Sequence, residues 1–455
     1  MQANFIEELR WRGMLHDMMP GTEEQLNKEM TAAYIGFDPT AASLHIGNLA
    51  TIMLLKHLQL CGHKPFALIG GATGMIGDPS GKAAEREFLS EEILRFNQDS
   101  IKKQLEKFLD FNSGQNSAEM VNNYDWFKDF SFLGFLREAG KHLSVNYMMS
   151  KDSVKKRLET GISFTEFSYQ LLQGYDFYWL YKNKNVRLQM GGSDQWGNIT
   201  TGTEIIRRKE ATMDIATMDI ATTDVATTDV GGSEEIEHRA FALTTPLVTK
   251  ADGTKFGKSE SGNVWLDPEM TTPYQFYQFW LNTADSECSR LLRVFTLYNQ
   301  QEIKNLEAEH AENPHLRIMQ KAIAKDVTTR VHSEKDFEIV KDASELLFDK
   351  NVIEQFEVVD NQVIGALDLI NVKKEDYRNC TNLTDFLATL ILDEKGEPII
   401  FKSKGDTRKA IQANSVSINK TKITDPNKVL DFELLRGKYL IINHGKQKVY
   451  VVELI

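Results

Sequence analysis

Two short motifs, far apart in the chain, contain the residues best suited to bind a nucleoside triphosphate. The first is His45-Ile46-Gly47-Asn48, shortly after Asp38-Pro39-Thr40, and the second is Lys255-Phe256-Gly257-Lys258-Ser259. The first motif opens an apolar-periodic helix, whose free N–H groups and dipole favour an anion. The second places two lysines on a glycine-containing loop, where they can neutralise polyphosphate charge during a reaction. Together the motifs predict two ends of one triphosphate site.

A glycine-rich segment from Gly70 to Lys82 has the composition of a phosphate-binding loop but lacks its spacing. A Walker loop needs glycine at the position of Ile76 and serine or threonine at the position of Ala83. Asp78 remains a candidate, with Lys82 and Arg86 on one expected helix face. An ordinary turn followed by a solvated basic face explains these residues equally well.

Tyr169, Gln173 and Asp176 have the spacing of one helix face, i, i+4 and i+7. Apolar and aromatic neighbours such as Phe167 and Phe177 predict that this helix is largely buried. Polar side chains on a buried helix must find hydrogen-bond partners, and a ligand ammonium or hydroxyl group is a suitable partner. An internally satisfied polar network is the alternative.

A second polar segment runs from Gln189 to Asn198. It combines the pair Gly191-Gly192, which permits close approach of a ligand to the backbone, with Asp194, whose carboxylate could accept a ribose hydroxyl. Tyr34 and His45, each taken alone, are more often packing residues. Their occurrence in order with the other motifs indicates a site.

The first half of the chain alternates apolar strands with amphipathic helices. Ala32 to Phe37 is expected to be a strand, Leu49 to Leu60 a helix, and Pro65 to Gly71 a strand. This alternation predicts an α/β fold with an open parallel sheet, in which ligands bind beyond the carboxyl ends of the strands. The pattern becomes mainly helical after the lysine loop, for example over Tyr274 to Leu281, with polar joints expected near 310–315 and 330–337.

Composition indicates a globular protein with more than one domain: 455 residues, 41% hydrophobic and 26% charged. The first twenty residues lack the apolar core of a signal peptide and no run reaches membrane-spanning length, which predicts a cytoplasmic protein without a membrane partner. Cys61, Cys288 and Cys380 are too few and too scattered for a disulfide framework or a zinc site, so no protein-ligated metal is expected.

The net charge of −12 conceals a basic end. From residue 401 onward, eleven Lys and Arg face five Asp and Glu. This region is expected to form a compact α+β module, with a helix near Asp406 to Gln412, a strand Val416 to Ile418, and a terminal hairpin Tyr439 to Leu454. A basic module on an acidic body suggests an appendage for a polyanion.

A repeat with a period of five residues lies between Ala211 and Val230, where Ala-Thr-Met-Asp-Ile and Ala-Thr-Thr-Asp-Val each occur twice. One interpretation is a coil of a β-helix or a protruding ribbon. Repeat folds need several stacked units to bury a core, so a solvent-exposed insertion is favoured.

Through these motifs the chain resembles bacterial-type tyrosyl-tRNA synthetases of class I, over nearly its full length apart from the repeat. His45 to Asn48 and Lys255 to Ser259 match the two class I signatures, and the helix with Tyr169, Gln173 and Asp176 matches the amino-acid pocket. The resemblance implies a Rossmann-like catalytic domain over 1–325 with an insertion at about 210–237, a helical connecting region over 326–385, and a small S4-like RNA-binding domain over 386–455.

The resemblance also implies roles for individual residues. Tyr34 and Asp176 would bond the substrate phenol, and the tyrosine pocket would comprise Tyr34, Asp78, Tyr169, Gln173, Asp176, Gln189 and Gln195. The catalytic residues would be Thr40, His45, Lys82, Arg86, Lys255 and Lys258. The ATP-binding residues would be Gly36, Asp38, His45, Gly47, Asn48, Thr51, Gly192, Asp194, Lys255, Lys258 and Ser259. The tRNA-binding residues would be Arg408, Lys409, Lys420, Lys422, Lys446 and Lys448.

The implied reaction has two steps. Tyrosine and ATP, with Mg²⁺ assisting, form tyrosyl-adenylate and pyrophosphate, and the tyrosyl group then passes to the terminal adenosine of tRNA(Tyr). A homodimer is implied as well. The chain departs from the family pattern at Ile35, where cysteine is frequent, and at Asn48, where histidine is usual. Three alternatives stay open: a tryptophanyl-tRNA synthetase, an RNA-binding regulatory protein with an inactive synthetase body, and an adenylyl-transferring enzyme for a small acid.

Overall fold

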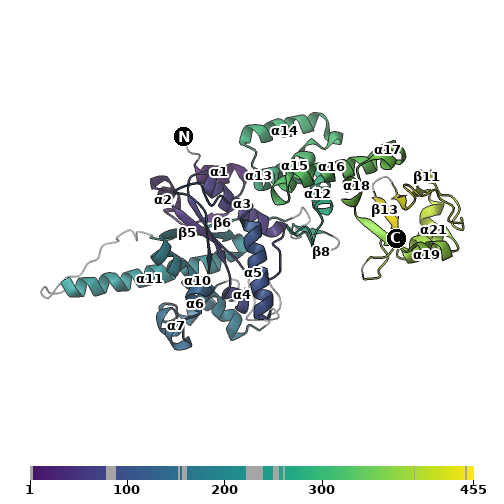
Figure 1. Cartoon of the computed structure of the whole chain (residues 1–455). Helices are drawn as coiled ribbons and strands as arrows, with labels where there is room; N and C mark the ends of the chain where they lie inside the picture. Colours follow the sequence, from purple (N-terminus) through teal and green to yellow (C-terminus); the bar gives the residue numbers. More distant parts are fainter. Residues whose placement is uncertain are drawn as a thin grey trace. The chain divides into compact units, whose positions relative to one another are not determined.

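The computed structural model describes residues 4–77, 89–151, 154–155, 161–221, 239–249, 256–259, 262–393, 395–445 and 448–455. The chain forms two compact units (Figure 1). The first comprises Met1–Met270 and Thr283–Val331, and the second comprises Thr271–Asn282 and His332–Ile455. The sequence-based boundaries at 325 and 385 stay predictions.

A six-stranded sheet forms the centre of the first unit. Its strands lie in the order β1 (Asp17–Met18), β6 (Phe241–Thr245), β5 (Val186–Gly192), β2 (Ala32–Phe37), β3 (Lys64–Ile69) and β4 (Glu119–Asn122). All neighbours are parallel except β1, which runs antiparallel to β6. The predicted parallel α/β sheet is therefore confirmed, with one antiparallel strand added at its edge.

The connections between the strands reverse direction at β2. Helix α3 (Ile46–Leu60) connects β2 to β3, and α5 (Glu91–Leu105) lies between β3 and β4, so the chain moves toward one edge of the sheet. Helix α10 (Phe164–Lys184) then precedes β5, and α11 (Trp196–Ala221) lies between β5 and β6, so the chain moves toward the other edge. Right-handed crossovers then place the two helix pairs on opposite faces of the sheet. The reversal leaves a crevice between the carboxyl ends of β2 and β5.

Helix α10 is defined by signals at both ends. Ser163 and Glu166 form a capping box at its start, and Asn185 ends it in the left-handed conformation at φ 52°. Its apolar side packs with Tyr34, Phe66 and α11 residues such as Ile205 in one buried cluster. The helix is thus fixed in register against β2, which matters because it carries three of the predicted site residues.

The remaining helices of the first unit are short or lie after the lysine motif. They are α1 (Phe5–Arg12), α2 (Thr22–Lys28), α4 (Thr73–Ile76), α6 (Tyr124–Phe127), α7 (Phe132–Glu138), α8 (Val145–Met149), α13 (Asp285–Phe295), α14 (Gln300–Glu312) and α15 (Ile318–Val331). A two-stranded ribbon, β7 (Lys258–Ser259) and β8 (Gly262–Asn263), contains the end of the lysine motif.

The second unit joins helices to a five-stranded sheet. Its helices are α12 (Pro273–Leu281), α16 (Glu334–Phe348), α17 (Val352–Val358), α18 (Asn361–Gly365), α19 (Lys374–Asn379), α20 (Leu383–Asp385) and α21 (Lys404–Gln412), with a π-helical turn at Phe386–Leu390. The sheet order is β11 (Thr421–Lys422), β10 (Val416–Ile418), β12 (Tyr439–His444), β13 (Lys448–Leu454) and β9 (Leu369–Val372).

The predicted helix, strand and terminal hairpin of the basic module are confirmed by α21, β10 and the β12–β13 pair. The sheet also includes β9, which lies before residue 386 and pairs in parallel with β13. Ile370 and Val372 of β9 belong to the same buried cluster as β12 and β13, so the module is closed by a strand from further upstream.

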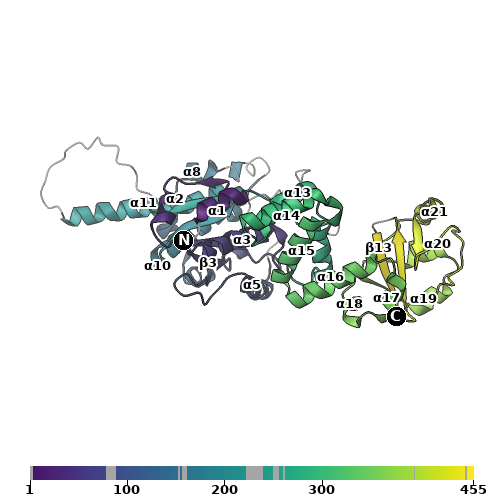
Figure 2. The ribbon, with the colours of Figure 1, turned by 90° about the horizontal axis from the view of Figure 1, so that it is seen from above.

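The first half of the repeat region, Ala211 to Ala221, is helical. Helix α11 continues through Ala221 and extends beyond the sheet (Figure 2), so the interpretation as a β-helix or ribbon is wrong for Ala211 to Ala221. Alanine and methionine are strong helix formers, and here they prolong a helix already started at Trp196. The rest of the repeat, 222–230, lies outside the described residues. Within the described chain, no helix is long and apolar enough to cross a membrane.

Candidate active site

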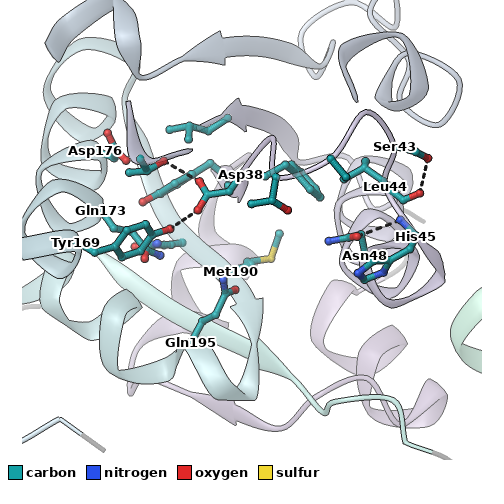
Figure 3. A pocket seen from close by; sticks show the side chains of 18 of the residues that line it. Asp38, Ser43, Leu44, His45, Asn48, Tyr169, Gln173, Asp176, Met190 and Gln195 are labelled. Atoms are coloured by element: carbon teal, nitrogen blue, oxygen red, sulfur yellow. Dashed lines mark hydrogen bonds between the residues drawn. The ribbon is translucent and has the colours of Figure 1, made fainter. Parts of the chain in front are cut away.

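A pocket of about 490 Å³ opens at the crevice between the carboxyl ends of β2 and β5. Figure 3 shows Tyr169, Gln173 and Asp176 at one end, Asp38 in the middle, and His45 and Asn48 at the other end. Of the predicted site residues, the pocket is lined by Tyr34, Gly36, Asp38, Thr40, His45, Asn48, Tyr169, Gln173, Asp176, Gln189 and Gln195. The structure therefore brings together the polar helix stripe and the first nucleotide motif.

Asp176 is held by two donors that sequence analysis missed. Its Oδ1 accepts a hydrogen bond from Trp126 Nε1 over 2.9 Å, and its Oδ2 accepts one from Asn123 Nδ2 over 3.0 Å. The side chain is only 1% exposed. Burial raises the pKa of Asp176 well above its usual range, and the two donated bonds offset this only in part. The carboxyl group is fixed at the pocket floor by this arrangement.

Tyr34 presents a buried hydroxyl group beside Asp176. Its Oη has no hydrogen-bond partner among the described residues. Burial and the Asp176 charge raise the pKa of Tyr34 well above its usual value, so the hydroxyl keeps its proton. A buried polar atom without a partner costs about 1–3 kcal/mol, which a ligand can recover by bonding to it. Tyr34 and Asp176 thus offer a donor and an acceptor to one ligand hydroxyl.

Two buried amide oxygens near these residues also lack partners in the described part of the chain. They are Oε1 of Gln173, on α10, and Oε1 of Gln189, on β5. Gln189 pairs directly with Tyr34 across the sheet, so the two side chains lie on one face. Amide oxygens accept hydrogen bonds, which makes this part of the pocket suited to ligand N–H groups.

Asp38 connects the two ends of the pocket. Its Oδ2 accepts a hydrogen bond from Tyr169 Oη over 2.9 Å, and its Oδ1 accepts one from Thr73 Oγ1 over 2.7 Å. Asn123 Nδ2 also donates to Thr73 Oγ1, over 3.1 Å, so one network runs from Tyr169 to Asp176. A Cβ on Gly70 would lie 2.1 Å from Asp38 Oδ1, which explains why glycine stands there.

The start of α3 forms the opposite end of the pocket. Asn48 Oδ1 accepts a hydrogen bond from the backbone N–H of His45 over 3.1 Å, which caps the helix. The Nδ2 group of Asn48 is therefore the part that can donate to a ligand. The predicted anion site at a helix N-terminus is consistent with this geometry, since the first turn of α3 faces the pocket.

The second motif meets the first through backbone contacts. The carbonyl of Gly257 accepts a hydrogen bond from Val264 N over 2.8 Å, and the carbonyl of Val264 accepts one from Ile46 N over 3.0 Å. The rings of Trp265 and His45 lie 5.8 Å apart. Lys255 lies outside the described residues. The described base of the second motif therefore lies at the start of α3, whereas one triphosphate site shared by the two motifs stays a prediction.

Some predicted residues do not line the pocket. Gly47, Thr51, Gly192 and Asp194 lie nearby: Thr51 Oγ1 donates to the Asn48 carbonyl over 2.8 Å, and Gly192 N donates to Gln195 Oε1 over 3.3 Å. Asp78, Lys82 and Arg86 lie outside the described residues. Lys258 and Ser259 form β7.

In the second unit, the predicted basic residues Arg408, Lys409, Lys420, Lys422 and Lys448 are exposed, and Lys446 lies outside the described residues.

Sequence analysis missed Thr73, Asn123 and Trp126 as residues that position the site. Each is far in sequence from the residue that it bonds, which is Asp38 for Thr73 and Asp176 for Asn123 and Trp126. One signal was present: Asn123 directly follows strand β4 and Trp126 comes three residues later, at the edge of the sheet where ligands of α/β folds bind.

Comparison with known proteins identifies the chain's relatives. The family of class I tRNA synthetases (W and Y) matches residues 26–349, and the tyrosine–tRNA ligase SYY-like C-terminal domain matches 378–452. A tyrosine–tRNA ligase of Cytophaga hutchinsonii is 56% identical over 453 residues, and one of Porphyromonas gingivalis is 53% identical over 459, with 99% of both chains covered in each case.

A solved structure agrees. A C-terminally truncated mitochondrial tyrosyl-tRNA synthetase from Aspergillus nidulans matches with a TM-score of 0.64 and 29% identity, covering 76% of this chain and 94% of its own. With relatives of this identity over its whole length, the chain belongs to the tyrosine–tRNA ligase family of class I aminoacyl-tRNA synthetases.

Proposed function

We propose that the protein activates L-tyrosine with ATP and transfers the tyrosyl group to tRNA(Tyr). The observation that carries this proposal is the buried pair of Tyr34 and Asp176, which presents a donor and an acceptor at the closed end of the pocket. A phenol hydroxyl can donate to Asp176 and accept from Tyr34 at once. An indole N–H, as in tryptophan, can only donate and would leave Tyr34 unpaired.

Selection against phenylalanine follows from the same groups. Phenylalanine would bury Tyr34 Oη and Asp176 without restoring a hydrogen bond to either of them. A site built to bond a hydroxyl strongly rejects the analogue that lacks it, and tyrosyl-tRNA synthetases are the established example of this effect. The amino-acid pocket can therefore be selective by itself.

The substrate ammonium group is assigned to the polar part of the pocket above the phenol. Tyr169, Gln173 and the predicted Asp78 would hold it, with Gln189 and Gln195 alongside. Support comes from the unpaired oxygens of Gln173 and Gln189 and from the Asp38 carboxylate bonded to Tyr169. Fixing the ammonium group directs the substrate carboxylate toward α3.

The activation step needs alignment rather than a general base. The tyrosine carboxylate, already ionised at neutral pH, attacks the α-phosphorus of ATP, the bond to the bridging oxygen breaks, and pyrophosphate leaves. Thr40 and His45 would face the γ-phosphate, with Lys82, Arg86, Lys255 and Lys258 around the departing pyrophosphate. Mg²⁺ would enter as the counter-ion of ATP, as part of that substrate.

The basic face of the second unit is assigned to tRNA. Lys420 lies in the β10–β11 turn, at φ 62°, and Lys422 lies in β11; both are exposed. We expect Lys420→Gln with Lys422→Gln to weaken tRNA charging and its salt dependence while leaving adenylate formation unchanged. Salt-independent tRNA binding in the parent protein would contradict this assignment.

A homodimer is part of the proposal. Large apolar side chains are exposed on three elements of the first unit, namely Phe132 and Leu133 on α7, Val145 on α8 and Phe164 at the start of α10. Apolar exposure on this scale is typical of a surface covered by a partner. Sedimentation of the parent protein and of Leu133→Glu tests it, and an unchanged dimer in the variant would exclude this surface.

ATP–pyrophosphate exchange with each amino acid, without tRNA, tests the activation step. We expect exchange with tyrosine alone. Exchange with tryptophan would assign the chain to the sister activity, and no exchange with any amino acid would favour a regulatory RNA-binding protein. Subsequent charging of tRNA(Tyr) separates a ligase from an adenylyl-transferring enzyme for a small acid.

A further inference from the structure

The carboxyl end of α13 is held by two arginines from distant parts of the first unit, Arg12, which is buried, and Arg330, which is partly buried. Arg12 comes from the last turn of α1, and Arg330 from the last turn of α15. The final carbonyls of a helix have no partners within the helix, and cations near them are favoured by the helix dipole. Neither arginine lines the pocket, so neither has a role in the proposed chemistry.

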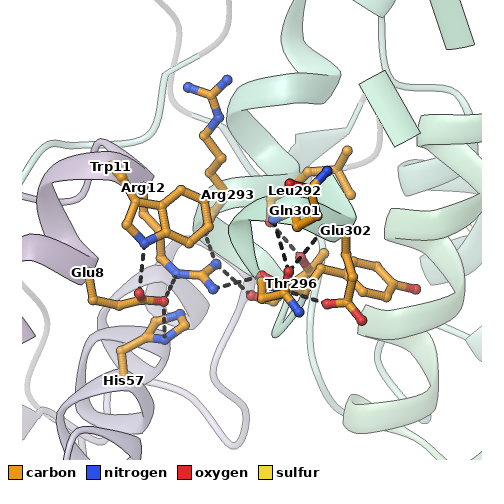
Figure 4. A network of polar contacts seen from close by, with 11 residues as sticks. Glu8, Trp11, Arg12, His57, Leu292, Arg293, Thr296, Gln301 and Glu302 are labelled. Carbon is orange, nitrogen blue, oxygen red and sulfur yellow. Dashed lines mark hydrogen bonds and ion pairs between the residues drawn. The ribbon is translucent and has the colours of Figure 1, made fainter. Parts of the chain in front are cut away.

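Arg12 bonds three carbonyls at this end. Its Nη1 donates to Arg293 O over 2.7 Å and to Thr296 O over 3.1 Å, and its Nη2 donates to Tyr298 O over 2.8 Å (Figure 4). Glu8 neutralises the guanidinium group through a 2.7 Å ion pair to Nε. Arg12 is 2% exposed, so its guanidinium group is shielded from solvent and held by these bonds.

Arg330 bonds the carbonyl of Phe295, the last residue of α13, through Nη2 over 2.8 Å. Asp326 pairs with the same guanidinium group, and Nη1 lies 3.0 Å from Met53 Sδ on α3. Burial lowers the pKa of Arg330 to about 10, so the group remains charged at neutral pH. Arg330 thereby links the end of α13 to the helix that starts at His45.

Phe295 carries this constraint to the lysine motif. Its ring, fully buried, stacks on the ring of Phe256 with centroids 5.8 Å apart and planes 25° apart. Phe256 directly precedes Gly257, whose φ of +90° strains any other residue and where a Cβ would lie 3.2 Å from Ile46 and 3.3 Å from Gly47. The loop base is therefore fixed on one side by α13 and on the other by α3.

We propose that Arg330 and Arg12 are positioning residues for the lysine motif: they fix the end of α13, and the Phe295–Phe256 stack transmits that position to the described base of the motif at Phe256 and Gly257. The proposal rests on the proposed activation of tyrosine. Because the loop acts on the departing pyrophosphate, a displaced loop lowers the rate of the chemical step and leaves tyrosine binding intact, since the tyrosine pocket is formed by other elements.

The test compares Arg330→Met and Phe256→Leu in the full-length protein. We expect each to lower kcat for tyrosine-dependent ATP–pyrophosphate exchange by roughly 10-fold to 100-fold, as a misplaced catalytic group does. The KM for tyrosine and its Kd from equilibrium dialysis should stay within about twofold of the parent values. Arg330→Lys, which keeps the positive charge and can still donate a hydrogen bond to Phe295 O, should recover most of the loss.

The double variant decides whether the two residues act through one path. If kcat of the double variant is reduced no more than kcat of the weaker single variant, the two residues act together and the proposal is supported. If the fold-losses in kcat of the two single variants multiply in the double variant, the proposal is overturned. Lys107→Met is the matched control, because Lys107 Nζ also donates to a terminal helix carbonyl, Val331 O of α15 over 3.0 Å, and no hydrogen bond joins it to the described residues of the loop. An equal kcat loss in this control would make the effect one of general stability and refute a positioning role.

Two further outcomes separate this inference from the activity on which it rests. If the parent protein shows no exchange with tyrosine, the proposed function fails. If the parent is active and Arg330→Met and Phe256→Leu keep the parental kcat, only the positioning role fails. Should Arg330→Met not fold, as shown by lost tyrosine binding and lost cooperative unfolding, Phe256→Leu and Phe295→Leu decide the question, with parental kcat in both overturning it.

Discussion

Trp126 donates a hydrogen bond to Asp176 and also stacks on Trp179. Its Nε1 donates to Asp176 Oδ1 over 2.9 Å, and its ring stacks on Trp179 with centroids 4.2 Å apart. The stack fixes the ring plane, and the ring plane directs the N–H at the carboxyl group. The orientation of the Asp176 carboxyl group, the proposed acceptor for the substrate phenol, is thus set by a residue that does not itself line the pocket.

Trp126→Phe should keep the packing and lose the donated bond. We expect the tyrosine affinity to fall roughly 10-fold, because the Asp176 carboxyl loses one of its two fixed donors and a hydrogen bond contributes about 0.5–1.5 kcal/mol. Equilibrium dialysis with tyrosine measures the change. Trp179→Phe is the control, since it retains an aromatic stack and touches no bond to Asp176; a similar loss there would attribute the effect to packing.

Tyr34→Phe should stabilise the free protein while impairing selection. The variant removes a buried hydroxyl without a partner in the described chain, so the free energy of unfolding should rise by about 1 kcal/mol. Discrimination between tyrosine and phenylalanine in pyrophosphate exchange should fall, because the phenol loses its donor. Urea unfolding without ligand and exchange with both amino acids give the two values. Decreased stability would show that the hydroxyl is satisfied in the free protein.

Gly70→Ala should impair activation by crowding Asp38. The new methyl group would lie 2.1 Å from Asp38 Oδ1 and 2.5 Å from Thr73 Oγ1, so the network to Tyr169 must move. We expect kcat/KM for tyrosine to fall by at least about 10-fold, as displacement of substrate-positioning groups does. Gly365→Ala, where a Cβ meets nothing within 4 Å, is the matched control and should leave activity unchanged.

Stability should fall in mild acid because of buried histidines. Burial lowers the pKa of His63 to about 4, and its Nδ1 accepts a hydrogen bond from Thr31 N over 3.1 Å, which requires the neutral ring. The unfolded chain, with a pKa near 6.5, binds the proton first, so stability is lost as pH falls from about 6.5 toward 4. Burial lowers the pKa of His57 as well, in the same direction.

The measurement is urea unfolding at pH 7.5 and pH 5. We expect the parent to lose roughly 1–2 kcal/mol from His63 alone at the lower pH. His63→Asn, whose side-chain oxygen can still accept from Thr31 N, should show a smaller difference between the two pH values. An identical difference in parent and variant would mean that His63 does not titrate in this range.

The elements that carry the site follow from local patterns. The spacing of Tyr169, Gln173 and Asp176 determined a polar helix face, because helix periodicity places these positions together whatever the surrounding fold. The strand Ala32–Phe37 and the terminal hairpin were also predictable from local patterns. Short-range signals, such as apolar alternation and turn residues, suffice for elements of this kind.

Only the tertiary structure decided which side chains meet. Asp38 bonds Tyr169, and Asn123 and Trp126 bond Asp176, across separations of 131, 53 and 50 residues. Arg330 likewise bonds the carbonyl of Phe295 at the end of α13. The first half of the repeat is helical because it continues helix α11, which begins at Trp196. Residue spacing in the sequence does not predict these long-range contacts. They depend on how the strands and helices pack, and the packing depends on the burial of side chains throughout the chain.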